Sequence, residues 1–100
     1  MKLPSKIKIG GHWVEIVIRS ESKDMYTNAG TRAAWQNRIY IQEDMAESKQ
    51  WSTLFHEILH EIDWQMNLGL SGNEKAIDAM GEGFYQVLAD NGLLKIKVGK

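Results

Sequence analysis

Residues 56–60 read His-Glu-Ile-Leu-His, and no other stretch of this chain bears so directly on chemistry. On a helix, residues four apart lie on one face, so the imidazoles of His56 and His60 would point the same way. Two neutral imidazoles in that arrangement can bind one Zn²⁺. A glutamate beside the first histidine can then act as general base on a metal-activated water. The run therefore predicts a zinc-dependent hydrolase in which Glu57 is the base.

A third metal ligand has to come from elsewhere in the sequence. Catalytic zinc sites usually have three protein ligands and one open position, and this chain has no cysteine. Glu74 is the favoured candidate, because the glycine-containing connection before it can fold a second helix back beside the first. Asp78 lies one helical turn after Glu74, where its carboxylate could accept the free ring N–H of a ligating histidine. The alternative third ligands are Asp78 itself, Glu82, Asp63 and His12.

The same residues also have more ordinary interpretations. The two histidines could be helix residues that match the motif by chance, and Glu57 could be an exposed helix carboxylate. Glu57 with His60 could belong to a di-iron helical bundle, but such a bundle needs a second unit of this kind, which the chain lacks. Ser71 and Glu74 have capping-box spacing, which would turn Glu74 back to the backbone. The metal site is the favoured interpretation because the motif lies in a strongly amphipathic segment.

The first half of the chain has the pattern of β-strands. Residues 6–19 alternate around Gly10-Gly11, which predicts a β-hairpin. Residues 30–35 and 38–42 resemble a second strand pair that turns at Gln36-Asn37. The polar residues 20–29 between them are expected to form a connection.

The second half has the pattern of two helices. Apolar residues recur at three- and four-residue steps after Asp44, which predicts a helix that is capped by Asp44 or Ser48 and stops near Gly69. A second helix is expected from residues 71–73 to Asp90, with Asn91-Gly92 at its end. Gly81 and Gly83 within it would allow the two helices to approach closely. Residues 93–98 are either a short last strand or a frayed tail.

Length and composition fit one small domain over residues 1–100. The order of strands and then helices indicates an α+β fold, with a small and mainly antiparallel sheet packed on two main helices. With 12 basic and 13 acidic residues, the net charge of −1 gives no electrostatic reason to expect nucleic acid or a membrane as partner. The absence of cysteine and of an apolar leader fits a cytoplasmic protein.

Two stretches together resemble a known family. His56 to His60, followed by the run Asn-Glu-Lys-Ala-Ile-Asp at 73–78, is similar to the H-E-x-x-H and E-x-x-x-D motifs of gluzincin metallopeptidases. The whole chain looks more like the small phage- and prophage-encoded metallopeptidases related to the ImmA/IrrE group, whose active helix is entered by a Thr-Leu pair such as Thr53-Leu54. The resemblance implies a minimal zincin-like fold in which His56, His60 and Glu74 bind zinc, Glu57 is the base and Asp78 supports a histidine.

The expected function is hydrolysis of peptide bonds in a peptide or protein substrate. Two features differ from the larger gluzincins: the gap between His60 and Glu74 is shorter, and the domain that completes their cleft is missing. A second function therefore stays open, in which the metal stabilises an inactive zincin-like domain that binds a protein partner. The sequence does not specify the substrate or the oligomeric state.

Overall fold

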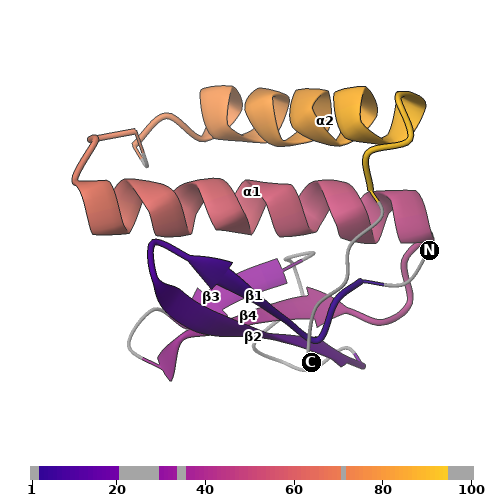
Figure 1. Ribbon diagram of the computed structural model, residues 1–100, viewed down its shortest axis with the longest axis horizontal. Coiled ribbons are helices and arrows are strands. Elements are labelled where there is room, and N and C mark those ends of the chain that lie inside the picture. The colour runs from indigo at the N-terminus through magenta and orange to yellow at the C-terminus, as the bar shows by residue number, and fades with distance from the viewer. Residues whose placement is uncertain (1–2, 21–29, 34–35, 71, 95–100) are drawn as a thin grey trace.

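Four strands and two helices make up the protein in the computed structural model (Figure 1), which describes residues 3–20, 30–33, 36–70 and 72–94. The elements in chain order are β1 (Lys6–Ile9), β2 (His12–Arg19), β3 (Gly30–Ala33), β4 (Arg38–Gln42), α1 (Glu47–Met66) and α2 (Glu74–Asp90). The predicted α+β class is confirmed. In the described ranges, neither helix is both long and apolar enough to cross a membrane.

The strands form one mixed sheet in the order β1-β2-β4-β3. Both predicted hairpins are present, since β1 pairs with β2 and β3 pairs with β4, each time antiparallel. The hairpins join through a parallel pairing of β2 with β4, in which Ile16 faces Ile39 and Ile18 faces Ile41. Two of the three pairings are antiparallel, as expected, but the parallel one was not predicted. It joins strands far apart in sequence, which local periodicity cannot reveal.

Both hairpin turns contain residues in the left-handed backbone region. Gly10 and Gly11 have φ of 58° and 88°, and the two-residue turn between β1 and β2 needs positive φ at both positions. Asn37, in the turn before β4, has φ of 54°. Asparagine tolerates this conformation better than most residues do, which explains why the predicted turns lie at these positions.

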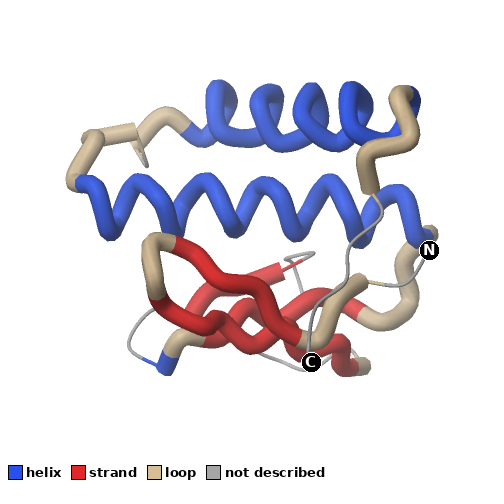
Figure 2. The backbone as a smooth tube through the Cα atoms, in the orientation of Figure 1, coloured by secondary structure: helices blue, strands red, loops and turns tan. Residues whose placement is uncertain are grey.

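Helix α1 covers one face of the sheet, and α2 runs along the outer side of α1 (Figures 1 and 2). The sheet therefore contacts mainly α1, and the core lies between them. The buried apolar side chains of this core are Ile9, Val14, Ile16, Ile39, Ile41, Trp51, Leu54 and Leu94. Ile77 of α2 is also fully buried. Helix α1 is thus held from both sides.

The helix ends differ in detail from those predicted. Helix α1 begins after Ala46 with no side-chain cap, so neither Asp44 nor Ser48 caps it. It ends at Asn67, which has φ of 56°, two residues before the expected stop at Gly69. Helix α2 is capped by Asn73, whose Oδ1 accepts a hydrogen bond from the Ala76 N–H at 3.1 Å. The predicted end of α2 at Asn91-Gly92 is confirmed.

Some sequence predictions lie outside the described residues. These are most of the polar connection (21–29), the end of the third predicted strand (34–35), a helix cap at Ser71 and the end of the predicted tail strand (95–98). Leu93 and Leu94 are described, and neither is in a strand.

One polar link ties α1 to the first hairpin. The Gln65 side-chain amide donates hydrogen bonds to the Ile9 carbonyl at 3.1 Å and to the Glu61 carboxylate at 2.8 Å. Glu61 is almost completely buried, with 1% of its surface exposed. Because a buried carboxylate without partners is costly, this contact both satisfies Glu61 and fixes the hairpin turn on the helix.

Gly10 leaves room for the Gln65 side chain in this link. A methyl group at Gly10 would collide with the Gln65 side-chain oxygen, whereas one at Gly11 would meet nothing within 4 Å. We expect Gly11→Ala to cost about 1 kcal/mol from its positive φ alone. Gly10→Ala should cost about 1 to 2 kcal/mol more, because Gln65 must leave its two acceptors. Urea unfolding of both variants measures the difference, and equal losses would show that the Gln65 contact contributes nothing.

Candidate metal centre

Two imidazoles on one side of α1 form the base of the candidate site. His56 and His60 are one helical turn apart, with ring centroids separated by 4.9 Å and ring planes at 61°. Their side chains are 20% and 12% exposed, so both are shielded from solvent but remain accessible. The spacing predicted from the sequence thus places both rings on the same face of the helix.

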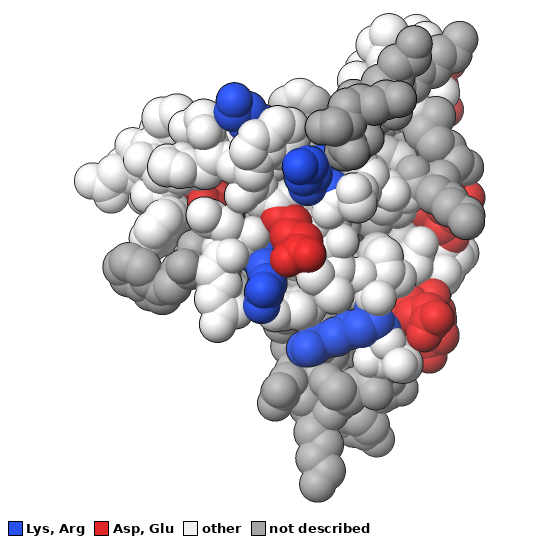
Figure 3. Space-filling model, turned by 60° about the horizontal axis from the view of Figure 1, so that its bottom comes forward, with Lys and Arg blue, Asp and Glu red and all other residues white. Residues whose placement is uncertain are grey.

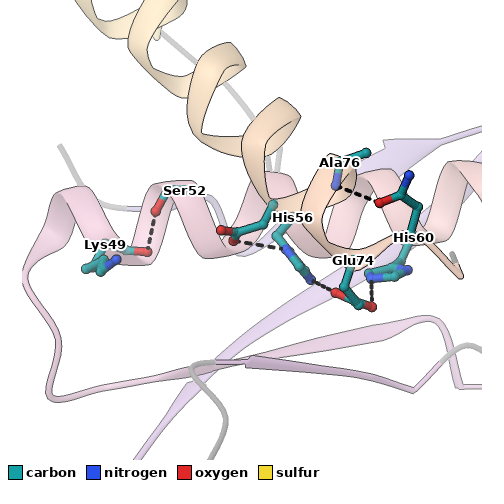
Figure 4. Close-up of polar contacts among 8 residues, drawn as sticks. Lys49, Ser52, His56, His60, Glu74 and Ala76 are labelled. Carbon is teal, nitrogen blue, oxygen red and sulfur yellow. Dashed lines mark hydrogen bonds and ion pairs between the residues drawn. The ribbon is translucent and has the colours of Figure 1, made fainter. Parts of the chain in front are cut away.

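The carboxylate of Glu74 connects the two histidines (Figure 4). Its Oε1 lies 3.1 Å from His56 Nε2, and its Oε2 lies 2.8 Å from His60 Nε2. One ligand atom from each of the three residues lies within 4.8 Å of the others, so this group could hold a metal ion. The structure thus brings together the three residues that the sequence suggested as ligands, although they come from two different helices.

Asp78 approaches the other side of the His56 ring. Its Oδ1 lies 3.5 Å from His56 Nδ1, one turn along α2 from Glu74. This distance is long for a hydrogen bond. His56 therefore has a carboxylate near each ring nitrogen, with Glu74 at Nε2 and Asp78 at Nδ1.

The other candidate ligands do not join this group. Asp63 points elsewhere, since its carboxylate accepts a hydrogen bond from the Leu70 N–H at 2.9 Å and so shapes the connection to α2. Among the residues that the structure describes, the metal-compatible group consists of His56, His60 and Glu74, without Glu82 or His12. The capping-box interpretation of Glu74 is wrong, because Glu74 is the first residue of α2 and its carboxylate faces the histidines.

A glycine sets the distance between the two helices at the site. A methyl group at Gly81 would lie 3.0 Å from the His56 backbone nitrogen and 3.2 Å from its Cα. Because these are backbone atoms, α2 can approach α1 this closely only where it has no side chain. The prediction of close approach is confirmed for Gly81 and wrong for Gly83, around which a methyl group would meet nothing within 4 Å.

Three carboxylates of α1 are buried, which the sequence did not predict. Glu57, Glu61 and Asp63 are 8%, 1% and 6% exposed. The interpretation of Glu57 as an exposed helix carboxylate is therefore wrong. Glu57 and Glu61 are four residues apart, as are His56 and His60, so the two pairs form adjacent stripes along the helix. The repeated glutamate after each histidine was the signal in the sequence from which the burial of Glu57 and Glu61 could have been predicted.

Glu74 lies on the open side of the site. Its side chain is 63% exposed, in contrast with the shielded histidines. The candidate site is therefore reached by solvent on the side of Glu74.

Comparisons with protein-family models, with curated proteins and with solved structures found no match to this chain. The functional assignment therefore depends on the residues and geometry of the site itself.

Metal content provides the first test of this site. We expect about one zinc per chain after purification without chelator, and a loss or marked weakening of binding in His60→Ala and Glu74→Ala, because each removes one of three ligands. Glu82→Ala is the matched control, since Glu82 lies two turns after Glu74 and outside the group. Elemental analysis and zinc titration measure the outcome. Wild-type protein that binds no added zinc would exclude the metal site.

The helix contact provides a second test. Gly81→Ala should destabilise the protein by about 1 to 2 kcal/mol through overpacking and weaken zinc binding, because it moves Glu74 away from the histidines. Gly83→Ala should stabilise it by about 0.5 to 1 kcal/mol through helix propensity and leave zinc binding unchanged. Thermal unfolding and zinc titration of both variants give the comparison. Unchanged zinc affinity in Gly81→Ala would show that zinc binding does not depend on the spacing of the two helices.

Proposed function

We propose that this protein is a zinc-dependent peptidase of the gluzincin type. The observation that supports this most directly is the Glu74 carboxylate lying 3.1 and 2.8 Å from the Nε2 atoms of the two histidines. This is the ligand set that the resemblance to H-E-x-x-H and E-x-x-x-D peptidases implies. The residues converge although they come from two helices.

The donor set fits zinc. Zinc prefers nitrogen and oxygen ligands at about 2.0 to 2.2 Å in a tetrahedron, which places neighbouring ligand atoms about 3.3 Å apart. In the structure one ligand atom from each of the three residues lies within 4.8 Å of the others, so small side-chain movements would bring them to this spacing. When bound, zinc supplies a lower pKa for the attacking water and polarisation of the substrate carbonyl. The other steps of the reaction depend on side chains of the protein itself.

Glu57 is the proposed general base. It follows His56 directly on α1, so its side chain emerges about 100° further around the helix and adjacent to the histidine face. It is buried, which favours efficient proton transfer by restricting competition from bulk water. Its carboxylate would accept the proton of the attacking water and later deliver it to the leaving amine.

Asp78 is the proposed support for His56. A carboxylate at Nδ1 keeps the ring proton on that nitrogen, so Nε2 keeps its lone pair for the metal. Closure of the present 3.5 Å distance by a few tenths of an ångström would give a hydrogen bond. Asp78 would thus position a ligand and not contact the substrate.

The proposed substrate is an extended peptide. β3 is the edge strand of the sheet on the side of β4, and it contacts α1. An edge strand has a row of backbone groups that can pair with an added strand. A peptide paired with β3 would run past the helix that carries the histidines, which suits cleavage of the main chain.

An alternative function is that of a metal-stabilised module that binds a protein partner. The observation in its favour is the row of exposed apolar side chains along α2, namely Met80, Phe84 and Val87. The two functions differ in what Glu57 does. A peptidase requires it for proton transfer, whereas a binding module does not.

Substitution of Glu57 by glutamine separates these functions. We expect Glu57→Gln to bind zinc as the wild type does and to lose hydrolysis by about a hundredfold or more, because the amide cannot accept the proton. Glu82→Gln makes the same change on an exposed part of α2 and should keep wild-type activity. A mixed peptide library analysed by mass spectrometry measures the cleavage. Equal cleavage by the wild type and Glu57→Gln would reject Glu57 as base, and zinc binding without any cleavage by the wild type would favour the binding module.

A further inference from the structure

Charge is distributed unevenly between the two layers of the molecule. The two helices together carry eight acidic and two basic residues. The sheet carries the opposite excess on the face that points away from α1. Figure 3 turns this side of the molecule towards the viewer and shows lysine and arginine side chains on it, with acidic side chains beside some of them. The net charge of −1 therefore does not describe either layer by itself.

Strand register defines this open sheet face. The inward positions of the strands carry the buried residues, such as Val14, Ile16, Ile39 and Ile41. Alternation places the intervening residues on the other side of the sheet. The open sheet face consists of Lys6, Lys8, Trp13, Glu15, Val17, Arg19, Arg38 and Tyr40. It thus has four basic residues and one acidic residue.

The cations of this face lie against aromatic rings. The ammonium groups of Lys6 and Lys8 lie 4.8 and 5.4 Å from the centroid of the Trp13 ring. The Arg19 guanidinium lies 4.1 Å from the centroid of the Tyr40 ring. Although two lysines adjoin it, Trp13 is 49% exposed. A large apolar ring exposed to this extent between cations is available to a planar ligand.

Glu15, the one acidic residue among those named for this face, is already paired. Glu15 Oε1 accepts a hydrogen bond from Arg38 Nε at 3.0 Å. The Tyr40 side chain and Glu15 both raise the pKa of Arg38, so its charge persists at every physiological pH. Glu15 is thus paired with Arg38, whereas Lys6 and Lys8 lie against the Trp13 ring.

We propose that the open sheet face binds single-stranded nucleic acid. Proteins that bind single strands combine cations that contact phosphates with aromatic rings on which bases stack. Here Lys6 and Lys8 flank Trp13, and Arg19 and Arg38 lie around Tyr40. Along β2, Trp13 is four residues, or about 13 Å, from the position beside Tyr40. One extended strand of a few nucleotides would thus contact both rings.

The same face suits a membrane less well. Binding to an anionic bilayer needs apolar groups that enter the headgroup region as well as cations. Besides Trp13, the aliphatic side chain among these residues is that of Val17, which is half-buried in the sheet. Duplex DNA would be contacted through phosphates alone, without use of the rings. The combination of rings and cations therefore favours unpaired bases.

This proposal does not depend on the metal site. The histidines and Glu74 belong to the helical layer, whereas the open sheet face lies on the opposite side of the sheet from α1 (Figure 1). Variants of the sheet face should accordingly leave zinc content unchanged.

Fluorescence anisotropy with labelled oligothymidylate and oligouridylate of about 15 nucleotides tests the proposal. We expect saturable binding that weakens as salt is raised. Lys6→Glu/Lys8→Glu should weaken it about tenfold or more, whereas Lys49→Glu/Lys75→Glu, an equal charge change on the helices, should weaken it less than about threefold. Trp13→Ala should weaken it about tenfold, and the equally exposed Trp64→Ala should not.

Circular dichroism and zinc content of each variant establish that the fold and the metal site are intact. Absence of binding to either oligonucleotide at low salt would overturn the proposal. Equal weakening by the two double variants would also overturn it, because the binding would then reflect overall charge. Binding to phosphatidylserine vesicles without binding to the oligonucleotides would assign the face to a membrane instead.

Discussion

The close approach of α2 to α1 is the constraint on which the candidate site depends. Gly81 lies directly against the His56 backbone, with no room for a methyl group. Because the helices are this close, the first turn of α2 brings the Glu74 carboxylate within reach of both imidazoles. A wider spacing would leave two histidines on one helix and a solvated glutamate on another. The absence of a side chain at Gly81 thus allows the histidines of α1 and the glutamate of α2 to form a single cluster.

Helix α1 can hold its histidines in place because it is anchored on the sheet as well. Its sheet side buries Trp51 and Leu54, and the polar link from Glu61 through Gln65 to Ile9 fixes its later turns. The buried Glu61 carboxylate is costly to desolvate, and the hydrogen bond from Gln65 offsets part of that cost. The hairpin turn, the helix and the histidines are therefore mechanically connected.

Sequence predicted those features of the fold that arise from neighbours in the chain. The glycine turn at Gly10, the pairing of His56 with His60 and the end of α2 follow from local backbone preference and periodicity. Features that depend on contacts between distant segments were harder to predict from the sequence. The parallel pairing of β2 with β4 leaves no local signature, and the difference between Gly81 and Gly83 depends on which one faces α1. Glu74 was predicted from the need for a third ligand, from a connection that can fold α2 back on α1, and from the resemblance of residues 73–78 to an E-x-x-x-D motif.

Composition and structure lead to different expectations about partners, and the reason is geometric. A net charge counts residues without regard to the face on which they lie. Here the acidic residues belong mainly to the helices, and the open sheet face collects cations next to Trp13 and Tyr40. Since screening limits surface electrostatics to about 10 Å, a ligand at the sheet responds mainly to the nearby cations and little to the distant helices. The two proposals therefore assign different ligands to the two layers: a metal ion to the helical layer and single-stranded nucleic acid to the sheet.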